Sequence, residues 1–224
     1  MRSILVNIEK NHIDDQGSPE VFDKRCTRRY SRMKNPIQKK RLLMGRLALQ
    51  KIISETKEQE KLSESIGYES YGKPVFISEK LKDYNFNLSH SGCYTLAALH
   101  KGGSIGVDIQ KIIPRKYDAI LEQMTDFEIE QIEVHKRPLF KAFQLWTLKE
   151  SYFKATGEGL TVPLKNYEFS SDTYRGIRIK CFGKKHPEEN WRFKSIFVKN
   201  YVLSYSISSK RPIHWNLTYE NLQN

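Results

Sequence analysis

The sequence predicts a folded α+β protein, and three observations carry this prediction. Apolar residues recur at helical spacing over about 37–54 and 143–156, which favours two long helices. Strict alternation of apolar and polar residues marks strands at 105–110 and 201–208. Finally, 12 Tyr, 11 Phe and 3 Trp among 224 residues supply large side chains for a core, although hydrophobic residues make up only 38%.

The charge of the chain predicts an anionic partner. The formal net charge is +12, which suits nucleic acid, a membrane surface, an acidic protein or a phosphorylated small molecule. Ten Lys or Arg and no Asp or Glu lie between Lys24 and Arg46, so this basic segment carries most of the excess. A solvated basic face is the alternative.

Cysteine usage and hydropathy indicate the compartment. The three cysteines show no metal-ligand spacing, and no stretch resembles a transmembrane helix or a signal peptide. We therefore expect thiols in a reducing cytoplasm.

The first hundred residues predict strands and two basic helices. Pro36 separates the two helices, and the charged residues 55–65 could extend the second. The expected elements are a strand at 2–8, a polar loop at 11–19, helices at 21–32 and 37–54, a turn at Tyr71-Gly72-Lys73-Pro74, and three strands within 86–110 with a hairpin turn at Gly102-Gly103.

The last of these strands carries a candidate cation site. Gly106, Asp108 and Gln110 share one face, with the two polar residues roughly 7 Å apart at Cα by strand rise. A carboxylate beside an amide oxygen, with a glycine that allows close approach, suits a hard cation with oxygen ligands. A solvated strand face is the alternative.

A second unusual acid lies on the helix that ends at Gly157, a C-cap glycine. Phe143, Trp146, Glu150 and Phe153 share one helix face, so Glu150 interrupts an apolar stripe. A buried carboxylate is costly unless a metal or cation meets it. The alternative is a surface pair with Lys154 at i+4.

The flanking segments complete the predicted elements. Residues 116–133 should be helical around a break at 124–126, with Glu128 as the capping-box partner of Thr125. After the helix we expect a turn at Leu160–Pro163 and strands at 167–171, 176–182, 191–198 and 201–208.

Three motifs together resemble a known family. They read N-L-S-H-S at 87–91, G-V-D-I-Q at 106–110 and W-T-L-K-E-S-Y-F-K-A-T-G at 146–157. Their order and spacing are similar to those of 4'-phosphopantetheinyl transferases of the surfactin-synthetase type. The resemblance extends to the basic helix, the Arg41–Gly45 segment, the YGKP turn and the G-x-G-L after the helix.

The resemblance implies an architecture of two similar α+β halves related by a pseudo-two-fold axis, with coenzyme A in the cleft between them. A boundary near Gly102-Gly103 would give an N-terminal half at 1–103, for the 3'-phosphate and adenine, and a C-terminal half at 104–224, for the metal and the catalytic helix.

It also implies Mg²⁺-dependent transfer of phosphopantetheine from coenzyme A to a serine of an apo acyl or peptidyl carrier protein, which leaves 3',5'-ADP. The metal ligands would be Asp108, Gln110 and Glu150, with Glu150 also as general base and Lys154 on the diphosphate. Gln110 replaces the more usual glutamate, and Glu128 is the candidate for a compensating acid.

The remaining contacts of coenzyme A follow from the same resemblance. His90 would contact the diphosphate, Ser89 and Lys73 the adenine end, and the 3'-phosphate would be bound by Arg25, Arg29 and Arg41. Nucleophilic catalysis by a Ser89–His90 pair is disfavoured, because neighbours on a strand point to opposite faces.

Two other functions compete with this one. A nucleic-acid-binding module would use the basic segment but would give no role to Asp108 and Glu150. A catalytically inactive relative that binds carrier proteins would explain Gln110. We expect a monomer that binds neither nucleic acid nor a membrane.

Overall fold

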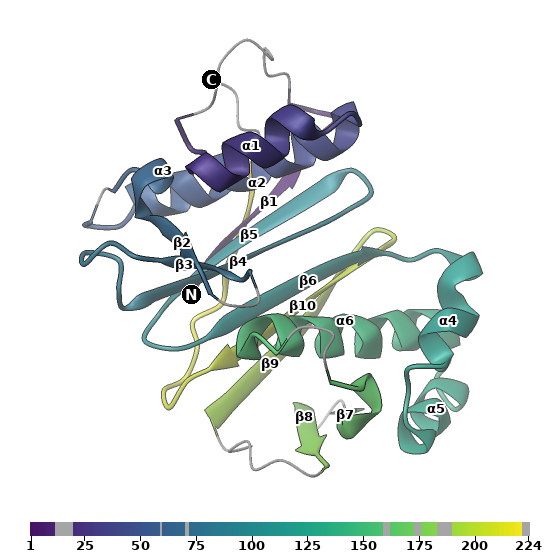
Figure 1. Cartoon of the computed structure of the whole chain (residues 1–224). Helices are drawn as coiled ribbons and strands as arrows, with labels where there is room; N and C mark the ends of the chain where they lie inside the picture. Colours follow the sequence, from purple (N-terminus) through teal and green to yellow (C-terminus); the bar gives the residue numbers. More distant parts are fainter. Residues whose placement is uncertain are drawn as a thin grey trace. The chain divides into compact units, whose positions relative to one another are not determined.

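The computed structural model describes residues 1–11, 20–58, 60–69, 72–158, 162–172, 176–182 and 190–220. The chain divides into two compact units: unit 1 is Met1–Gly103 with His214–Asn224, and unit 2 is Ser104–Ile213. Each unit combines helices with sheets, which confirms the α+β class (Figure 1). Most of the predicted polar loop, Tyr71 of the YGKP turn and Leu160 of the later turn lie outside the described residues.

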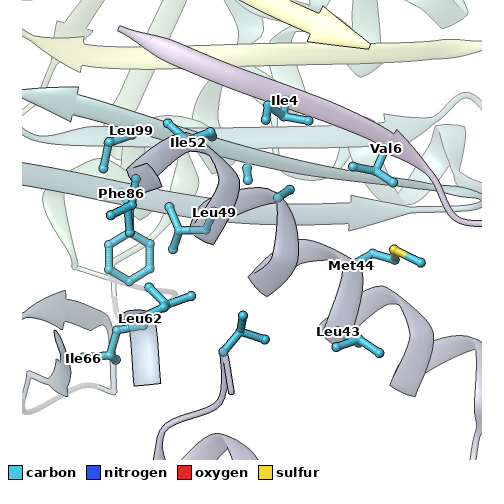
Figure 2. Close-up of a cluster of buried hydrophobic side chains, with 14 of the residues drawn as sticks. Ile4, Val6, Leu43, Met44, Leu49, Ile52, Leu62, Ile66, Phe86 and Leu99 are labelled. Atoms are coloured by element: carbon cyan, nitrogen blue, oxygen red, sulfur yellow. The ribbon is translucent and has the colours of Figure 1, made fainter. Parts of the chain in front are cut away.

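Unit 1 is built on a four-stranded sheet with the order β11-β1-β5-β4. Its long helix α2 packs on this sheet, and Figure 2 shows Leu49 and Ile52 of the helix among Ile4, Phe86 and Leu99 of the strands. The elements are β1 (Arg2–Asn7), α1 (Lys24–Arg32), α2 (Pro36–Ser54), α3 (Leu62–Ser65), β2 (Ile66–Tyr68), β3 (Pro74–Phe76), β4 (Tyr84–Ser91), β5 (Tyr94–Lys101) and β11 (Asn216–Glu220).

The two basic helices begin where their capping residues place them. The Asn35 side chain accepts hydrogen bonds from the backbone N–H groups of Ile37 and Gln38, and Pro36 is the first residue of α2. Pro36 therefore starts the second helix. That helix ends at Ser54, so the charged residues 55–65 do not extend it as the sequence allowed.

The end of the chain departs from the predicted division. Residues 104–224 were expected to form one half, but β11 pairs in parallel with β1, from Arg2 opposite Asn216 to Val6 opposite Glu220. The Ser3 hydroxyl also donates to the carbonyl of Asn216 at 3.0 Å. These main-chain and side-chain bonds hold the last strand in unit 1.

The predicted hairpin at Gly102-Gly103 is wrong. β5 belongs to the sheet of unit 1, whereas β6 belongs to a three-stranded sheet of unit 2 with the order β6-β10-β9. Gly102 adopts a φ of 87°, and its N–H donates to the carbonyl of Asp83 at 2.8 Å, so the turn leads the chain out of the first sheet.

Unit 2 places one long helix against its sheet. In Figure 1, α6 runs along β6 and β10, and the contacts confirm this packing. The predicted strands at 105–110, 176–182, 191–198 and 201–208 are all present. The elements are β6 (Ile105–Lys111), η1 (Pro114–Lys116), α4 (Tyr117–Leu121), α5 (Asp126–Glu133), α6 (Pro138–Thr156), η3 (Leu164–Asn166), β7 (Tyr167–Asp172), β8 (Gly176–Cys181), β9 (Trp191–Val198) and β10 (Tyr201–Ser208).

Helix α6 ends as the sequence predicted, but its burial differs. Gly157 has a φ of 78°, and its N–H donates to the carbonyl of Phe153 at 2.9 Å. Nearly the whole surface of the helix is buried, and Trp146 and Glu150 of the predicted stripe are only half-buried. Among its charged residues Lys149 is the most deeply buried, at 0% exposure.

All three cysteines are thiols in the structure. Within the described ranges, every helix is too short or too polar to span a lipid bilayer.

Candidate active site

Gly106 lets helix α6 lie directly on strand β6. A Cβ atom added to Gly106 would lie 1.9 Å from the carbonyl oxygen of Ser151 and 2.5 Å from the backbone nitrogen of Ala155. Any side chain at this position would force the helix away from the strand. The sequence predicted that this glycine allows a close approach, and the group that approaches is the helix that carries Glu150 and Lys154.

Small polar side chains support the same contact along β10. The hydroxyls of Ser151 and Ser206 lie 2.7 Å apart, and so do those of Thr147 and Ser204. All four side chains are buried, so each pair satisfies groups that would otherwise be costly to bury. These pairs fix how α6 is placed on the sheet.

Asp108 receives two side-chain donors at this contact. Its Oδ1 atom accepts a hydrogen bond from Nζ of Lys154 at 2.6 Å, and its Oδ2 atom accepts one from Nε2 of Gln110 at 3.2 Å. Lys154 also donates to the carbonyl of Val107 at 3.2 Å. Asp108 is 2% exposed and the Lys154 side chain 30%, so a buried carboxylate faces a cation that reaches solvent.

Glu150 belongs to the same electrostatic cluster. Burial raises the pKa of its carboxyl group above the ordinary value, the charge of Asp108 raises it further, and Lys154 opposes both effects. Lys154 makes an ion pair with Asp108 on the strand in addition to its electrostatic interaction with Glu150, so it is more than the i+4 partner of Glu150 on the helix surface. The structure thus brings together Asp108, Gln110, Glu150 and Lys154.

Glu128, expected as a compensating metal ligand, has a structural role instead. Its Oε2 atom lies 2.6 Å from Nζ of Lys149 and accepts from the N–H of Thr125, and its Oε1 atom accepts from the N–H of Phe169 at 2.8 Å. Glu128 and Lys149 are both fully buried. The predicted capping box with Thr125 is confirmed.

Lys149 joins three separate segments of unit 2. Besides Glu128, its ammonium group donates to the carbonyls of Gln123, Leu164 and Tyr167 at 3.3, 3.0 and 2.7 Å. Burial lowers the pKa of this lysine, while the neighbouring carboxylate of Glu128 opposes the shift. In the sequence, Lys149 is the lysine that directly precedes Glu150 in the motif at 146–157. A lysine within an otherwise buried helix was the signal for its role.

The oxygen donors at Asp108, Gln110 and Glu150 suit a hard divalent cation. Carboxylate and amide oxygens are the ligands that Mg²⁺ and Ca²⁺ take in proteins. Within the described ranges, no group of three or more His, Cys, Asp or Glu side chains is arranged to hold a metal.

Unit 1 contains a pocket of about 410 Å³ lined by basic side chains. Of the predicted residues for coenzyme A, five line it: Arg25, Arg29, Arg41, Ser89 and His90. Lys73 is not among its lining residues, although its neighbours Gly72 and Pro74 are. Burial lowers the pKa of Lys73.

Part of the Arg41 guanidinium is hydrogen-bonded within the protein. Its Nε atom donates to the carbonyl of Gly92 at 2.9 Å, and its Nη2 atom contacts the same oxygen. Gly92 forms the turn between β4 and β5, next to Ser89 and His90. Arg41 therefore fixes the strand end that carries these two residues as well as contributing its charge to the pocket.

Arg46 and Tyr68 line the pocket, and nothing in the sequence indicated that both contact Asp23. Nη2 of Arg46 lies 3.5 Å from Oδ2 of Asp23, and both side chains are buried. The Tyr68 hydroxyl donates to the same oxygen at 2.9 Å. An aspartate directly before the basic segment was the signal that a capping residue was present.

Comparison with known proteins identifies the family. The model of the 4'-phosphopantetheinyl transferase N-terminal region matches residues 21–101, and that of the 4'-phosphopantetheinyl transferase superfamily matches residues 104–206. The 4'-phosphopantetheinyl transferase ffp of Bacillus subtilis is 30% identical over 163 residues, which are 72% of this chain and 68% of that protein. The chain belongs to the 4'-phosphopantetheinyl transferase family.

Two further members of the transferase family are similar to this chain over part of their length. Another 4'-phosphopantetheinyl transferase of B. subtilis is 30% identical over 140 residues, 61% of this chain and 57% of that protein. The L-aminoadipate-semialdehyde dehydrogenase-phosphopantetheinyl transferase of Rattus norvegicus is 27% identical over 206 residues, 81% of this chain and 66% of that protein. The chain thus spans between about half and two thirds of the length of these two transferases.

Each of the two transferase family models covers one group of candidate residues. The N-terminal model covers the pocket of unit 1, and the superfamily model covers Asp108, Gln110, Glu150 and Lys154. The family resemblance predicted from the three motifs is confirmed.

Proposed function

We propose that this chain is a Mg²⁺-dependent 4'-phosphopantetheinyl transferase. It takes phosphopantetheine from coenzyme A and attaches it to a serine of an apo acyl or peptidyl carrier protein. The observation that carries the proposal is the 2.6 Å ion pair between Asp108 and Lys154, with Glu150 beside them, because it unites the G-V-D-I-Q and W-x-x-K-E motifs in one charged cluster.

The reaction exchanges the phosphoanhydride bond of the coenzyme A diphosphate for a phosphate ester of the carrier serine. The carrier serine oxygen bonds to the phosphorus that bears the pantetheine, the P–O bond to the bridging oxygen breaks, and 3',5'-ADP leaves. We assign the serine proton to Glu150. Its raised pKa makes the ionised carboxylate a stronger base than an ordinary glutamate.

Lys154 and Asp108 prepare the site for a diphosphate. The Lys154 ammonium is partly exposed while it is held by Asp108, so it is oriented by one carboxylate and available to an anion. Asp108, Gln110 and Glu150 are the residues that would hold Mg²⁺, since they offer oxygen donors only. When bound, the metal neutralises charge on the diphosphate and on the leaving group.

The pocket of unit 1 supplies the cationic side chains for the nucleotide. We assign binding of the 3'-phosphate to Arg25 and Arg29. Arg41 contributes the guanidinium N–H groups that do not bind the carbonyl of Gly92. Ser89 and His90 line the same pocket and keep their predicted roles at the adenine and the diphosphate. Lys73 remains a prediction. We further propose that the protein acts as a cytoplasmic monomer without a nucleic-acid or membrane partner.

The proposal is tested by incubating the protein with coenzyme A, Mg²⁺ and an apo carrier protein, and weighing the carrier by mass spectrometry. A gain of one phosphopantetheine is expected, and none on a carrier whose acceptor serine is replaced by alanine. Binding of coenzyme A and carrier without modification would indicate an inactive relative. Salt-dependent binding of arbitrary duplex DNA, with no binding of coenzyme A, would indicate a nucleic-acid module.

A further inference from the structure

Tyr68 makes two different contacts in the wall of the basic pocket. The guanidinium carbon of Arg25 lies 4.4 Å from the centre of the tyrosine ring, and the tyrosine hydroxyl donates to Oδ2 of Asp23 at 2.9 Å. Both Tyr68 and Arg25 line the pocket. The ring is therefore in a position to orient a cationic side chain.

A second group limits where the Arg25 guanidinium can lie. Gly72, between β2 and β3, has a φ of 80°, and a Cβ atom built on it would be 3.3 Å from Nη2 of Arg25. The guanidinium thus lies against the Tyr68 ring and close to the backbone of the turn that follows β2. Arginine rather than lysine suits this place, because only the planar guanidinium can stack on the ring.

The hydroxyl of Tyr68 acts on the helix that carries Arg25. Oδ1 of Asp23 accepts hydrogen bonds from the backbone N–H groups of Arg25 and Cys26, both at 2.9 Å, and so caps α1. The other carboxylate oxygen of Asp23 accepts a hydrogen bond from the Tyr68 hydroxyl and forms an ion pair with the buried guanidinium of Arg46. Burial raises the pKa of Tyr68 to about 12, so the hydroxyl keeps the proton that it donates.

Arg46 makes this arrangement sensitive to Tyr68. Its Nε and Nη1 atoms are buried and have no hydrogen-bond partner among the described residues. Its closest carboxylate contact is the 3.5 Å approach to Asp23. A loose pair of buried charges depends on neighbouring donors to hold its geometry.

We infer that Tyr68 is a positioning residue of this pocket, whose ring holds Arg25 for an anionic group and whose hydroxyl holds α1 in place through Asp23. The inference rests on the proposed function, in which the pocket takes the 3'-phosphate of coenzyme A. Tyr68 acts through Arg25, so its loss weakens recognition of that phosphate and leaves contacts to the rest of the nucleotide unchanged.

The test measures dissociation constants of 3',5'-ADP and 5'-AMP by calorimetry, and uses their ratio as the preference for the 3'-phosphate. Tyr68→Leu removes the ring and should reduce this preference roughly 2- to 30-fold, the range of a cation–π contact. Tyr68→Phe keeps the ring, so it should preserve the preference while lowering the melting temperature.

Tyr84 provides a matched control in the same unit. Lys101 lies over its ring at 4.8 Å, and its hydroxyl donates to Glu58 at 3.1 Å, but it does not line the pocket. Tyr84→Leu removes the same two kinds of contact and should leave the preference for the 3'-phosphate unchanged.

A double-mutant cycle with Arg25→Met shows whether Tyr68 acts through Arg25. The double variant should lose no more preference than Arg25→Met alone, whereas independent actions would add. Additive losses, or an unchanged preference in Tyr68→Leu, would overturn the inference. If Tyr68→Leu does not fold, loss of the preference in Tyr68→Phe overturns it, and retention with a lowered melting temperature supports it.

The wild-type protein separates this inference from the proposed function. A wild type that binds 3',5'-ADP no more tightly than 5'-AMP overturns both. A wild type with a clear preference that survives in Tyr68→Leu overturns only the role of Tyr68.

Discussion

The ammonium group of Lys154 lies 2.6 Å from the Oδ1 atom of Asp108, which joins a helix residue to a strand residue 46 positions earlier in the chain. Gly106 makes this distance possible, because it allows the backbone of α6 to lie on β6. The two acids of the cluster are thus fixed by the packing of a helix on a strand.

Asp108→Asn and Glu150→Gln should each lower the rate of carrier modification by about 100-fold or more, while the fold is retained. Both changes keep the shape of the side chain and remove its charge. Glu130→Gln, at an exposed glutamate of α5, is the control and should keep the wild-type rate. Wild-type turnover by Asp108→Asn or Glu150→Gln at saturating Mg²⁺ would contradict their placement in the site.

Gln110→Glu should make the metal-free protein less stable and its melting temperature more responsive to Mg²⁺. Nε2 of Gln110 now donates to Oδ2 of Asp108 at 3.2 Å, and a glutamate would replace this donor by a second negative charge. Thermal melts over a Mg²⁺ titration check this. A variant that is destabilised equally with and without Mg²⁺ would remove position 110 from the proposed metal site.

Lys149→Met should lower the free energy of unfolding by about 3–5 kcal/mol, because it leaves the fully buried carboxylate of Glu128 without its partner. Urea denaturation measures the effect. Lys165→Met, at an exposed lysine, should change stability by less than about 0.5 kcal/mol. A similar small effect at Lys149 would mean that the pair does not hold unit 2 together.

His100→Leu should stabilise the protein, and more so in acid. Burial lowers the pKa of His100 to about 4, and both ring nitrogens lack a hydrogen-bond partner among the described residues. Because the unfolded chain binds a proton below about pH 6.5 and the folded chain only near pH 4, the wild type loses stability as the pH falls through this range.

The loss attributed to His100 is about 2 kcal/mol between pH 7.5 and 5. Urea denaturation at the two pH values should show that His100→Leu loses that much less than the wild type. His135→Gln, at an exposed histidine, is the control. Equal acid sensitivity of the wild type and His100→Leu would show that His100 is not the group responsible.

The elements with strong local patterns could be predicted from the sequence. Alternation fixed the faces of β6 and β10, and the glycine after α6 marked its end. β11 could not be predicted, because its pairing with β1 joins residues more than 200 positions apart and its own pattern is weak. The sequence of a turn also does not say whether the next strand joins the same sheet, which explains the error at Gly102-Gly103.

Within the two sites, the sequence could not predict the directions in which side chains point. On a helix buried on nearly all sides, the apolar pattern no longer shows which charged residue points inward. Glu150 was expected on the buried stripe, whereas Lys149 is the fully buried residue. In the basic segment, charge alone indicated an anionic partner or a solvated basic face. The structure shows that Arg46 is buried against Asp23, whereas Arg25 lies on Tyr68.

The pairing of β11 with β1 has a consequence for synthesis on the ribosome. Unit 2 is continuous in sequence, whereas unit 1 needs strands from both sides of it. Until residues 216–220 emerge, β1 keeps one edge unpaired, open to strands of other chains. We therefore expect the second unit to complete its fold before the first, the reverse of the usual order in which the N-terminal part of a nascent chain folds first.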